Sequence, residues 1–233
     1  AAEMPVVTGV EVRYTRNLPG DPVEVDVDGD LASDGGRLWD FSDGPTDVGV
    51  TFVLQTPADL PNVDLFPDAP YAAPMLVESP DLLGFFRLDE GDETTLSMLG
   101  MATTADVPDS SRTVVVYDEP LVLYRYPFTV GDTWEQTVTY RDAVAYGLPN
   151  QGVEHYQFEV DAHGTVRLPG GTEVSDVLRV RIRVDQTLAL AAGEHTRTYH
   201  QLIWVRPCFG ELARVVGEDA EFAMVDEFRR YYP

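Results

Sequence analysis

Closely spaced carboxylates form the pattern in this sequence that is most typical of a metal site. They are Asp26, Asp28, Asp30 and Asp34. Alternating carboxylates also begin calcium-binding loops, because Ca²⁺ prefers oxygen ligands. The EF-hand loop, however, requires glycine at its sixth position, where this chain has Leu31, and a bidentate glutamate at its twelfth. A solvated turn after a strand is therefore the favoured interpretation, and a calcium site is the alternative.

A second acidic group could in principle carry out acid–base chemistry. It consists of Asp89, Glu90, Asp92 and Glu93, between two expected strands. Paired carboxylates hydrolyse glycosidic bonds when one of them lies in an apolar pocket that raises its pKa. The run DEGDE is more typical of an exposed loop tip. A glycan-acting hydrolase that uses these loop carboxylates is thus kept as an alternative to a protein without catalytic activity.

The remaining reactive side chains do not form a recognisable catalytic set. His195 and His200 have opposite parity, so on one strand they face opposite ways and cannot share a metal. Asp161 and His163 have the same parity, but two ligands make a weak site. The chain has no G-x-S-x-G motif and no lysine, which excludes lysine-based covalent catalysis. These observations predict a protein that is not an enzyme.

Aromatic side chains provide the candidate ligand-binding residues. They are Trp39, Tyr124, Tyr126, Trp134 and Trp204. Tryptophan and tyrosine on strands could line a pocket for a carbohydrate or a lipid. The same residue types are also common in the core of a β protein, and we favour that interpretation for most of them.

The strands that must position these residues are organised around a central hairpin at residues 161–184. A short β-prone run at 165–168 is broken by Pro169, Gly170 and Gly171, and a longer run follows. In that second run the sequence LRVRIRV alternates apolar residues with arginines. Alternation of this kind predicts one face in the core and the arginine face in water.

The rest of the chain also alternates with the period of β-strands. Strands are expected at 9–16, 23–28, 37–42, 47–55, 83–88, 94–101, 113–117, 121–126, 134–141, 153–160, 196–205, 211–216 and 221–228. Six prolines between 56 and 80 predict a long loop or edge, and 142–148 is the only helix-like candidate. We therefore predict one all-β antiparallel domain over residues 1–233, with about a dozen strands in a strongly curved, barrel-like sheet or a two-sheet sandwich.

Composition narrows the possible partners and surroundings. Forty acidic residues against 16 basic ones give a formal net charge of −24, which disfavours nucleic acid and anionic membranes as partners and suggests a halophilic source. No apolar run is long enough for a transmembrane segment. No signal peptide is expected in this chain, because its first residues lack the charged and apolar regions of one.

Cys208, the single cysteine, is expected to be a buried apolar residue that forms no intrachain disulfide.

Several short motifs occur in the order seen in a family of uncharacterised secreted and surface lipoproteins of the Bacteroidetes type. The central hairpin carries its pattern D-x-x-G-T-[LV]-x-L-P-x-G followed by V-L-R, at Asp161, Gly164, Thr165, Leu168, Pro169, Gly171, Val177, Leu178 and Arg179. WDFS begins at Trp39, FPDAPY at Phe66, YPFTVGDTW at Tyr126 and WVRPCFG at Trp204, with Cys208 where glycine is usual. The resemblance implies a secreted or periplasmic β domain similar to the curved sheet of lipoprotein carriers such as LolA, and it implies no reaction.

The sequence as a whole predicts a non-enzymatic extracytoplasmic protein with a binding or structural role. Its partner is expected to be a small apolar or amphipathic ligand, or a macromolecule of the cell envelope. The alternatives are the glycan-acting hydrolase and a calcium-dependent surface adhesion domain. The oligomeric state and the identity of the ligand are left open by the residues alone.

Overall fold

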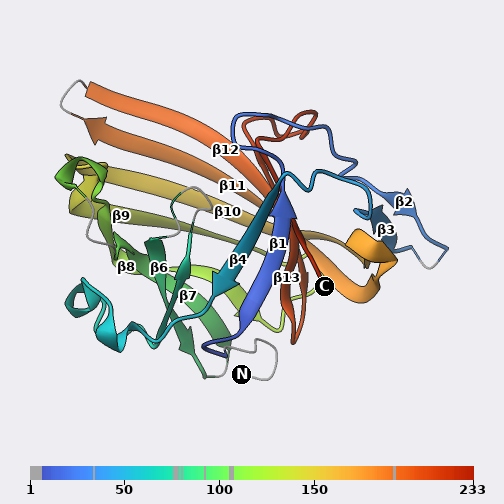
Figure 1. Cartoon of the computed structure of the whole chain (residues 1–233), viewed down its shortest axis with the longest axis horizontal. Helices are drawn as coiled ribbons and strands as arrows, with labels where there is room; N and C mark the ends of the chain where they lie inside the picture. The colour runs from blue at the N-terminus through green and yellow to red at the C-terminus, as the bar shows by residue number, and fades with distance from the viewer. Residues whose placement is uncertain are drawn as a thin grey trace.

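The computed structural model describes residues 7–33, 35–75, 79, 81–91, 93–104, 108–190 and 193–233. These residues form one strongly curved sheet of 14 strands with four short 3₁₀ turns (Figure 1). The strands are β1 (Glu11–Arg16), β2 (Asp30–Leu31), β3 (Arg37–Asp40), β4 (Val48–Val53), β5 (Tyr71–Pro74), β6 (Leu82–Asp89), β7 (Thr94–Thr103), β8 (Val114–Tyr126), β9 (Thr133–Ala145), β10 (Leu148–Arg167), β11 (Glu173–Leu190), β12 (Gly193–Arg206), β13 (Gly210–Gly217) and β14 (Glu227–Tyr231). The predicted all-β domain with a barrel-like sheet is confirmed.

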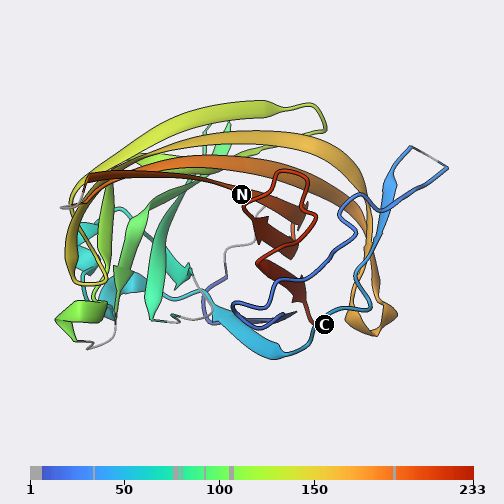
Figure 2. The same ribbon diagram turned by 90° about the horizontal axis from the view of Figure 1, so that it is seen from above.

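The sheet closes almost completely on itself. Twelve strands follow one another in the order β4-β1-β14-β13-β12-β11-β10-β9-β8-β7-β6-β5, and neighbours along this path are antiparallel. The two end strands meet at a single bridge, where Gln55 and Ala72 exchange backbone hydrogen bonds of 2.8 and 2.9 Å. Figure 2 shows the long strands bent into an arch, with β4 across its open side. Closure of this kind removes the exposed edges that an open sheet would have.

The central hairpin has the structure that its sequence predicts. β10 and β11 pair antiparallel through most of their length, and Pro169–Gly171 forms the turn between them. Val180, Ile182 and Val184 point into the barrel and are buried, as alternation requires.

The arginine face of β11 is not uniformly exposed, contrary to the prediction. Arg183 is exposed, but the side chain of Arg179 is only 8% exposed. The cover is a strap, formed by residues 23–33 and 35–41, that packs on the outside of the barrel. Arg179 donates to the carboxylate of Asp161 and to the strap carbonyl of Val27, and its guanidinium lies over the ring of Trp39. Alternation could not reveal this cover, because the strap is far away in sequence.

The barrel wall therefore has a core on each of its two faces. The inner core fills the barrel and contains most of the aromatic residues of β8, β9 and β10. The outer core lies between the strap and strands β11 to β14, where Trp39 and Phe41 pack edge-on against Trp204. β3 holds the strap in place by pairing parallel to the end of β10, which is the one parallel ladder in the described residues.

One side of the barrel is much longer than the other. Strands β8 to β12 have 13 to 20 residues, whereas β13, β14, β1, β4 and β5 have four to eight. β13 pairs with β12 only between His200 and Arg206. The first part of β12, residues 193–199, thus has no strand on that edge within the described part of the chain. The long strands extend past the short ones and leave one end of the barrel open at the side (Figure 1).

Local predictions failed where tertiary contacts or turn geometry decide the conformation. Residues 23–28 form no strand, since only Val23 pairs, with Val225. The helix-like stretch 142–148 is the β9–β10 hairpin, with Tyr146 and Gly147 at φ of 50° and 75°. Positive φ at two central residues is typical of the tight turn that joins antiparallel strands. The last predicted strand is formed only from Glu227 onward.

Cys208 is exposed, so its predicted burial is wrong. It lies in the β12–β13 turn with a φ of 63°, in the left-handed region that favours glycine. Glycine is usual at this position of the WVRPCFG motif, and glycine adopts a positive φ without strain.

The Pro-rich stretch 56–80 is a loop and an edge in its described part, as expected. It contains two 3₁₀ turns, Pro57–Asp59 and Val63–Leu65, followed by the four-residue edge strand β5. Residues 76–78 and 80 lie outside the described residues.

Candidate functional site

A hollow at the open end of the barrel is the candidate site. Its volume is about 360 Å³, within the range of small-molecule sites. It is lined by residues from the ends of β9 to β12: Ala145, Tyr146, Leu148, Asn150, Leu188, His195 and Arg197. We call it the mouth hollow. Tyr146 and Leu148 are 64% and 65% exposed, so large apolar side chains at this end face solvent.

Strand register explains why these residues meet. Leu188 pairs with His195, and Gln186 pairs with Arg197, so all four lie on the inner face of the β11–β12 ladder. The β9–β10 turn at Tyr146 and Gly147 brings Leu148 and Asn150 to the same end of the barrel. The hollow exists because the neighbouring β13 is too short to cover it.

The polar side chains of Asn150, His195 and Arg197 line the mouth hollow. Arg197 donates through Nε to Oε1 of Gln186 at 2.8 Å, and its guanidinium lies 5.3 Å from the centre of the Tyr199 ring. The Oδ1 atom of Asn150 is buried and has no hydrogen-bond partner within the described residues. A buried polar atom without a partner is costly, and a ligand or a water could satisfy it.

A buried carboxylate, Glu154, lies near the mouth hollow, because Gln186 bonds both Glu154 and the lining residue Arg197. Tyr156 donates to it at 2.6 Å and Tyr117 at 3.3 Å, and Gln186 and Tyr140 also donate. We call these five residues the Glu154 cluster. Gln186 belongs to the cluster and accepts from Arg197, which connects the cluster to the mouth. A Cβ at Gly152 would overlap the hydroxyl end of Tyr140, so glycine at this position allows Tyr140 to cross β10.

The tyrosines of the Glu154 cluster are protonated at neutral pH. Burial raises the pKa of Tyr117 and of Tyr156 well above the ordinary value, and the nearby carboxylate of Glu154 raises both further. Burial also raises the pKa of the adjacent Tyr199 to about 12. Each phenol therefore acts as a hydrogen-bond donor, and none is available as a base at neutral pH.

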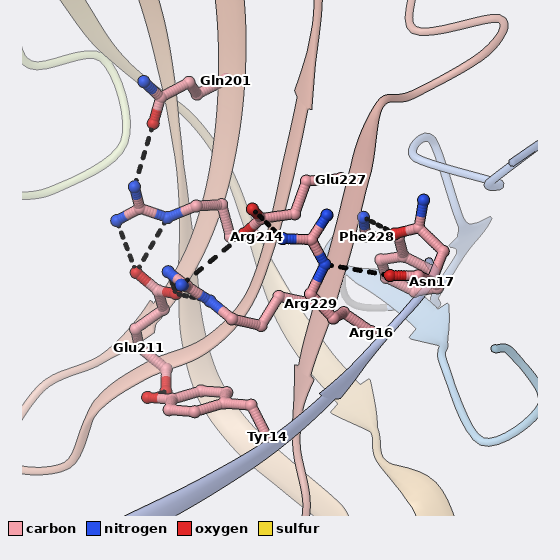
Figure 3. Close-up of polar contacts among 9 residues, drawn as sticks. All are labelled: Tyr14, Arg16, Asn17, Gln201, Glu211, Arg214, Glu227, Phe228 and Arg229. Carbon is pink, nitrogen blue, oxygen red and sulfur yellow. Dashed lines mark hydrogen bonds and ion pairs between the residues drawn. The ribbon is translucent and has the colours of Figure 1, made fainter. Parts of the chain in front are cut away.

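A second, partly buried polar group lies along the neighbouring strands β13, β14 and β1 (Figure 3). Glu211 accepts from Arg214 at 2.7 Å and from Arg229 at 2.7 Å, and Arg16 donates to Glu227 at 3.0 Å. Arg214 also reaches Gln201 on β12, at 3.2 Å. We call Glu211, Arg214, Arg229, Glu227 and Arg16 the arginine network.

The charges of the arginine network compensate one another. Burial alone would raise the pKa of Glu211, but the positive charges of Arg214 and Arg229 and their hydrogen bonds outweigh it and lower the pKa to about 2. A carboxylate that is ionised and fully paired is neither an acid nor a base at neutral pH. The network is therefore a structural connection between three short strands.

The five aromatic residues singled out from the sequence do not form one group. Trp39 and Trp204 pack on each other in the outer core, with their ring centres 5.9 Å apart. Tyr124, Tyr126 and Trp134 belong to the inner core, on the other face of the sheet. All five are at most 9% exposed, in agreement with the interpretation that residues of this type are core. Tyr126 also lines a hollow of about 50 Å³, which is too small for a drug-sized ligand.

The calcium site considered for Asp26, Asp28, Asp30 and Asp34 remains a prediction. Oδ1 of Asp26 accepts from the backbone N–H groups of Asp28 and Gly29, which is the bonding of a polar turn. Asp30 begins β2, and Asp34 lies outside the described residues. Among the residues that the structure describes, no three His, Cys, Asp or Glu side chains form a group that could hold a metal ion.

The residues proposed for acid–base or metal chemistry are in exposed or paired positions. Asp89 forms an ion pair with Arg87 at 2.8 Å, Glu90 and Glu93 are exposed, and Asp92 lies outside the described residues. Asp161, which might have chelated a metal with His163, instead binds Arg179 and Arg181. No helix within the described ranges is long and apolar enough to span a membrane.

Sequence reasoning missed the residues of the mouth hollow and most of the Glu154 cluster. A signal was present: Glu154 and Gln186 have the same parity as the buried residues Phe158 and Val184 on their own strands. A polar residue at a core position predicts a buried hydrogen-bonded group. The mouth hollow had no such signal, because it depends on where β13 ends.

Comparisons with known proteins add no relative. No protein-family model, no curated protein and no solved structure matches this chain. The resemblance to secreted and surface lipoproteins therefore stays a prediction.

Proposed function

We propose that this protein is a non-enzymatic binding protein that holds a small amphipathic ligand in its mouth hollow. The observation that carries the proposal is the lining of that hollow. Leu148, Leu188 and Tyr146 supply apolar surface, and a few polar groups stand among them. A mostly apolar concavity with few polar groups is the usual form of a small-molecule site.

The packed barrel interior supports binding at the mouth rather than deep inside. Tyrosines of the Glu154 cluster and the aromatic residues of the inner core occupy the space below the hollow. A ligand would therefore rest on the phenols and keep part of its surface in contact with solvent. The expectation of an extracytoplasmic location, secreted, periplasmic or on the outer surface, is part of the proposal and derives from the sequence resemblance.

Binding can be tested with a single-chain amphiphile and two matched variants. Decanoate would be titrated by calorimetry into the wild type, Leu148→Asp and Leu31→Asp. Leu148 is 65% exposed at the mouth, and Leu31 is 72% exposed on β2, outside the barrel, so neither change should prevent folding. Full burial of a leucine side chain contributes a favourable free energy of roughly 1.5–3 kcal/mol. Loss of this contact in L148D should therefore weaken binding about tenfold or more.

The control decides whether the site is the mouth. L31D should bind decanoate as the wild type does. Equal weakening in both variants would indicate an effect of added negative charge alone, and binding unaffected by L148D would place the ligand elsewhere.

A further inference from the structure

We infer that the mouth hollow recognises the carboxylate head group of an anionic amphiphile, with Arg197 as the residue that binds it. This inference rests on the proposed function and adds the chemical class of the ligand. It is argued from the charge of the hollow, from the bonds that Arg197 makes and from the groups around it.

The mouth hollow is cationic in a strongly acidic protein. The chain has 40 acidic and 16 basic residues, yet the lining of the hollow includes the basic side chains of His195 and Arg197 and no Asp or Glu. An anion is therefore drawn to this end of the barrel and repelled by most of the remaining surface.

Arg197 is an exposed residue of β12 that keeps donors free. Its Nε donates to Gln186, and its planar face lies over Tyr199. Within the described residues its two terminal nitrogens have no hydrogen-bond partner, and Arg197 forms no ion pair. Most arginines of this chain pair with a carboxylate, as Arg214 does with Glu211. A guanidinium with both terminal nitrogens available can bind a carboxylate through two parallel hydrogen bonds.

The carboxylates nearest to Arg197 in the ladder are already engaged or face away. Glu154 is bound by phenols and by Gln186. Asp185 accepts from Thr198 at 2.6 Å and pairs with Arg183. Glu194 has the opposite parity on β12, so it projects from the other face of the sheet. Among the residues that the structure describes, Arg197 therefore has Gln186 as a partner but no carboxylate, and a bound anion would provide one.

Asn150 offers a further polar contact. Its Oδ1 is buried beside the hollow without a partner in the described part of the chain. A water or a hydroxyl on the ligand would satisfy this atom. The apolar chain of the ligand would lie on Leu148 and Leu188, whose side chains line the same hollow.

The test compares three ten-carbon probes on four proteins by calorimetry at neutral pH. The probes are decanoate, the uncharged decan-1-ol and decyl phosphate. The proteins are the wild type, Arg197→Gln, Arg197→Lys and Arg206→Gln. Arg206 lies at the other end of β12, so R206Q makes the same change of charge as R197Q outside the mouth hollow. Melting curves for the three variants verify that they fold.

We expect decanoate to bind the wild type at least tenfold more tightly than decan-1-ol does. R197Q should weaken decanoate binding about tenfold to a hundredfold, the range expected for hydrogen bonds to a charged group, and should leave decan-1-ol binding within twofold. R206Q should change neither affinity by more than about twofold. Arg197→Lys, which keeps the charge without the planar donor pair, should recover only part of the loss.

Other outcomes overturn the inference in distinguishable ways. Equal affinity of the wild type for decanoate and decan-1-ol would reject recognition of an anion and leave the proposed binding function standing. Equal weakening of decanoate binding by R197Q and R206Q would reject Arg197 as the contact. Decyl phosphate binding more than tenfold more tightly than decanoate would reject the carboxylate in favour of a phosphate head group. If no probe binds the wild type, the proposed function and this inference both fail.

Discussion

The buried carboxylate of Glu154 and the partly buried carboxylate of Glu211 are stabilised in different ways. Glu154 is surrounded by the donors of tyrosines and a glutamine, whereas Glu211 is paired with two arginines. Neutral donors stabilise a carboxylate without a second buried charge, and the nearby Arg197 forms no ion pair within the described part of the chain. The arginine network neutralises its charges internally and is suited to joining strands. This contrast is why we assign ligand binding to the mouth and a structural role to the network.

The network makes a specific prediction about acid stability. The pKa of Glu211 in the folded protein is about 2, below its ordinary value of 4.5. A lowered folded-state pKa stabilises the protein above the unfolded-state pKa, and that contribution is lost as the pH falls from about 4.5 toward 2. It amounts to about 3 kcal/mol at most. Urea unfolding at pH 6, 4 and 3 should show that Glu211→Gln is much less stable than the wild type at pH 6, with the difference shrinking at low pH.

The control for this experiment is Glu173→Gln. Glu173 forms an exposed ion pair with Arg167, so its loss should change the free energy of unfolding by less than about 1 kcal/mol at any of these pH values. A constant difference between E211Q and the wild type from pH 6 to pH 3 would contradict the lowered pKa of Glu211.

At the scale of elements, the strap is attached to the barrel through the short parallel ladder between β3 and β10. Gly164 pairs with Arg37 at the start of that ladder. A Cβ at position 164 would overlap the backbone carbonyl of Arg37, which cannot move without displacing β3. The sequence motif around Gly164 thus has a physical reason: the close approach of a second backbone.

We therefore expect Gly164→Ala to loosen the strap. The variant should lose about 1–3 kcal/mol of stability in chemical denaturation, as overpacked sites do, and its tryptophan emission should shift to the red as Trp39 becomes accessible to water. Gly49→Ala is the matched control, because a Cβ at Gly49 would contact nothing within 4 Å. If G164A and G49A were equally stable and had the same emission spectrum, β3 would not be anchored by this contact.

At the scale of the whole molecule, the charge of −24 is distributed unevenly. The arginine network uses Arg16, Arg214 and Arg229 in the interior, where they pair with glutamates. The remaining surface carries most of the acidic excess, so its self-repulsion opposes the folded state. Salt screens exposed charges much more than buried ones.

The melting temperature should therefore rise by several degrees between 0.1 and 1 M NaCl at pH 7, because the screening length falls from roughly 10 to 3 Å. Differential scanning fluorimetry would measure it. The same scan near pH 4.2, the isoelectric point of the sequence, provides the control, since the net charge is then close to zero and the rise should largely disappear. A melting temperature that falls with salt at pH 7 would contradict the prediction and the expected halophilic character.

The all-β class, the central hairpin and most strand positions could be predicted from the amino-acid sequence. They follow from local rules: alternation along β11 selects its buried face, and Pro169 to Gly171 select a turn. The burial of Arg179 under the strap, the division of the aromatic residues between two cores and the position of the mouth hollow became known from the folded structure. Each of these depends on segments that are distant in sequence, such as the strap over β11 or residues 145–150 beside the β11–β12 ladder. Local sequence patterns carry no information about contacts between distant segments. The candidate site consists of such contacts, so it could not be predicted.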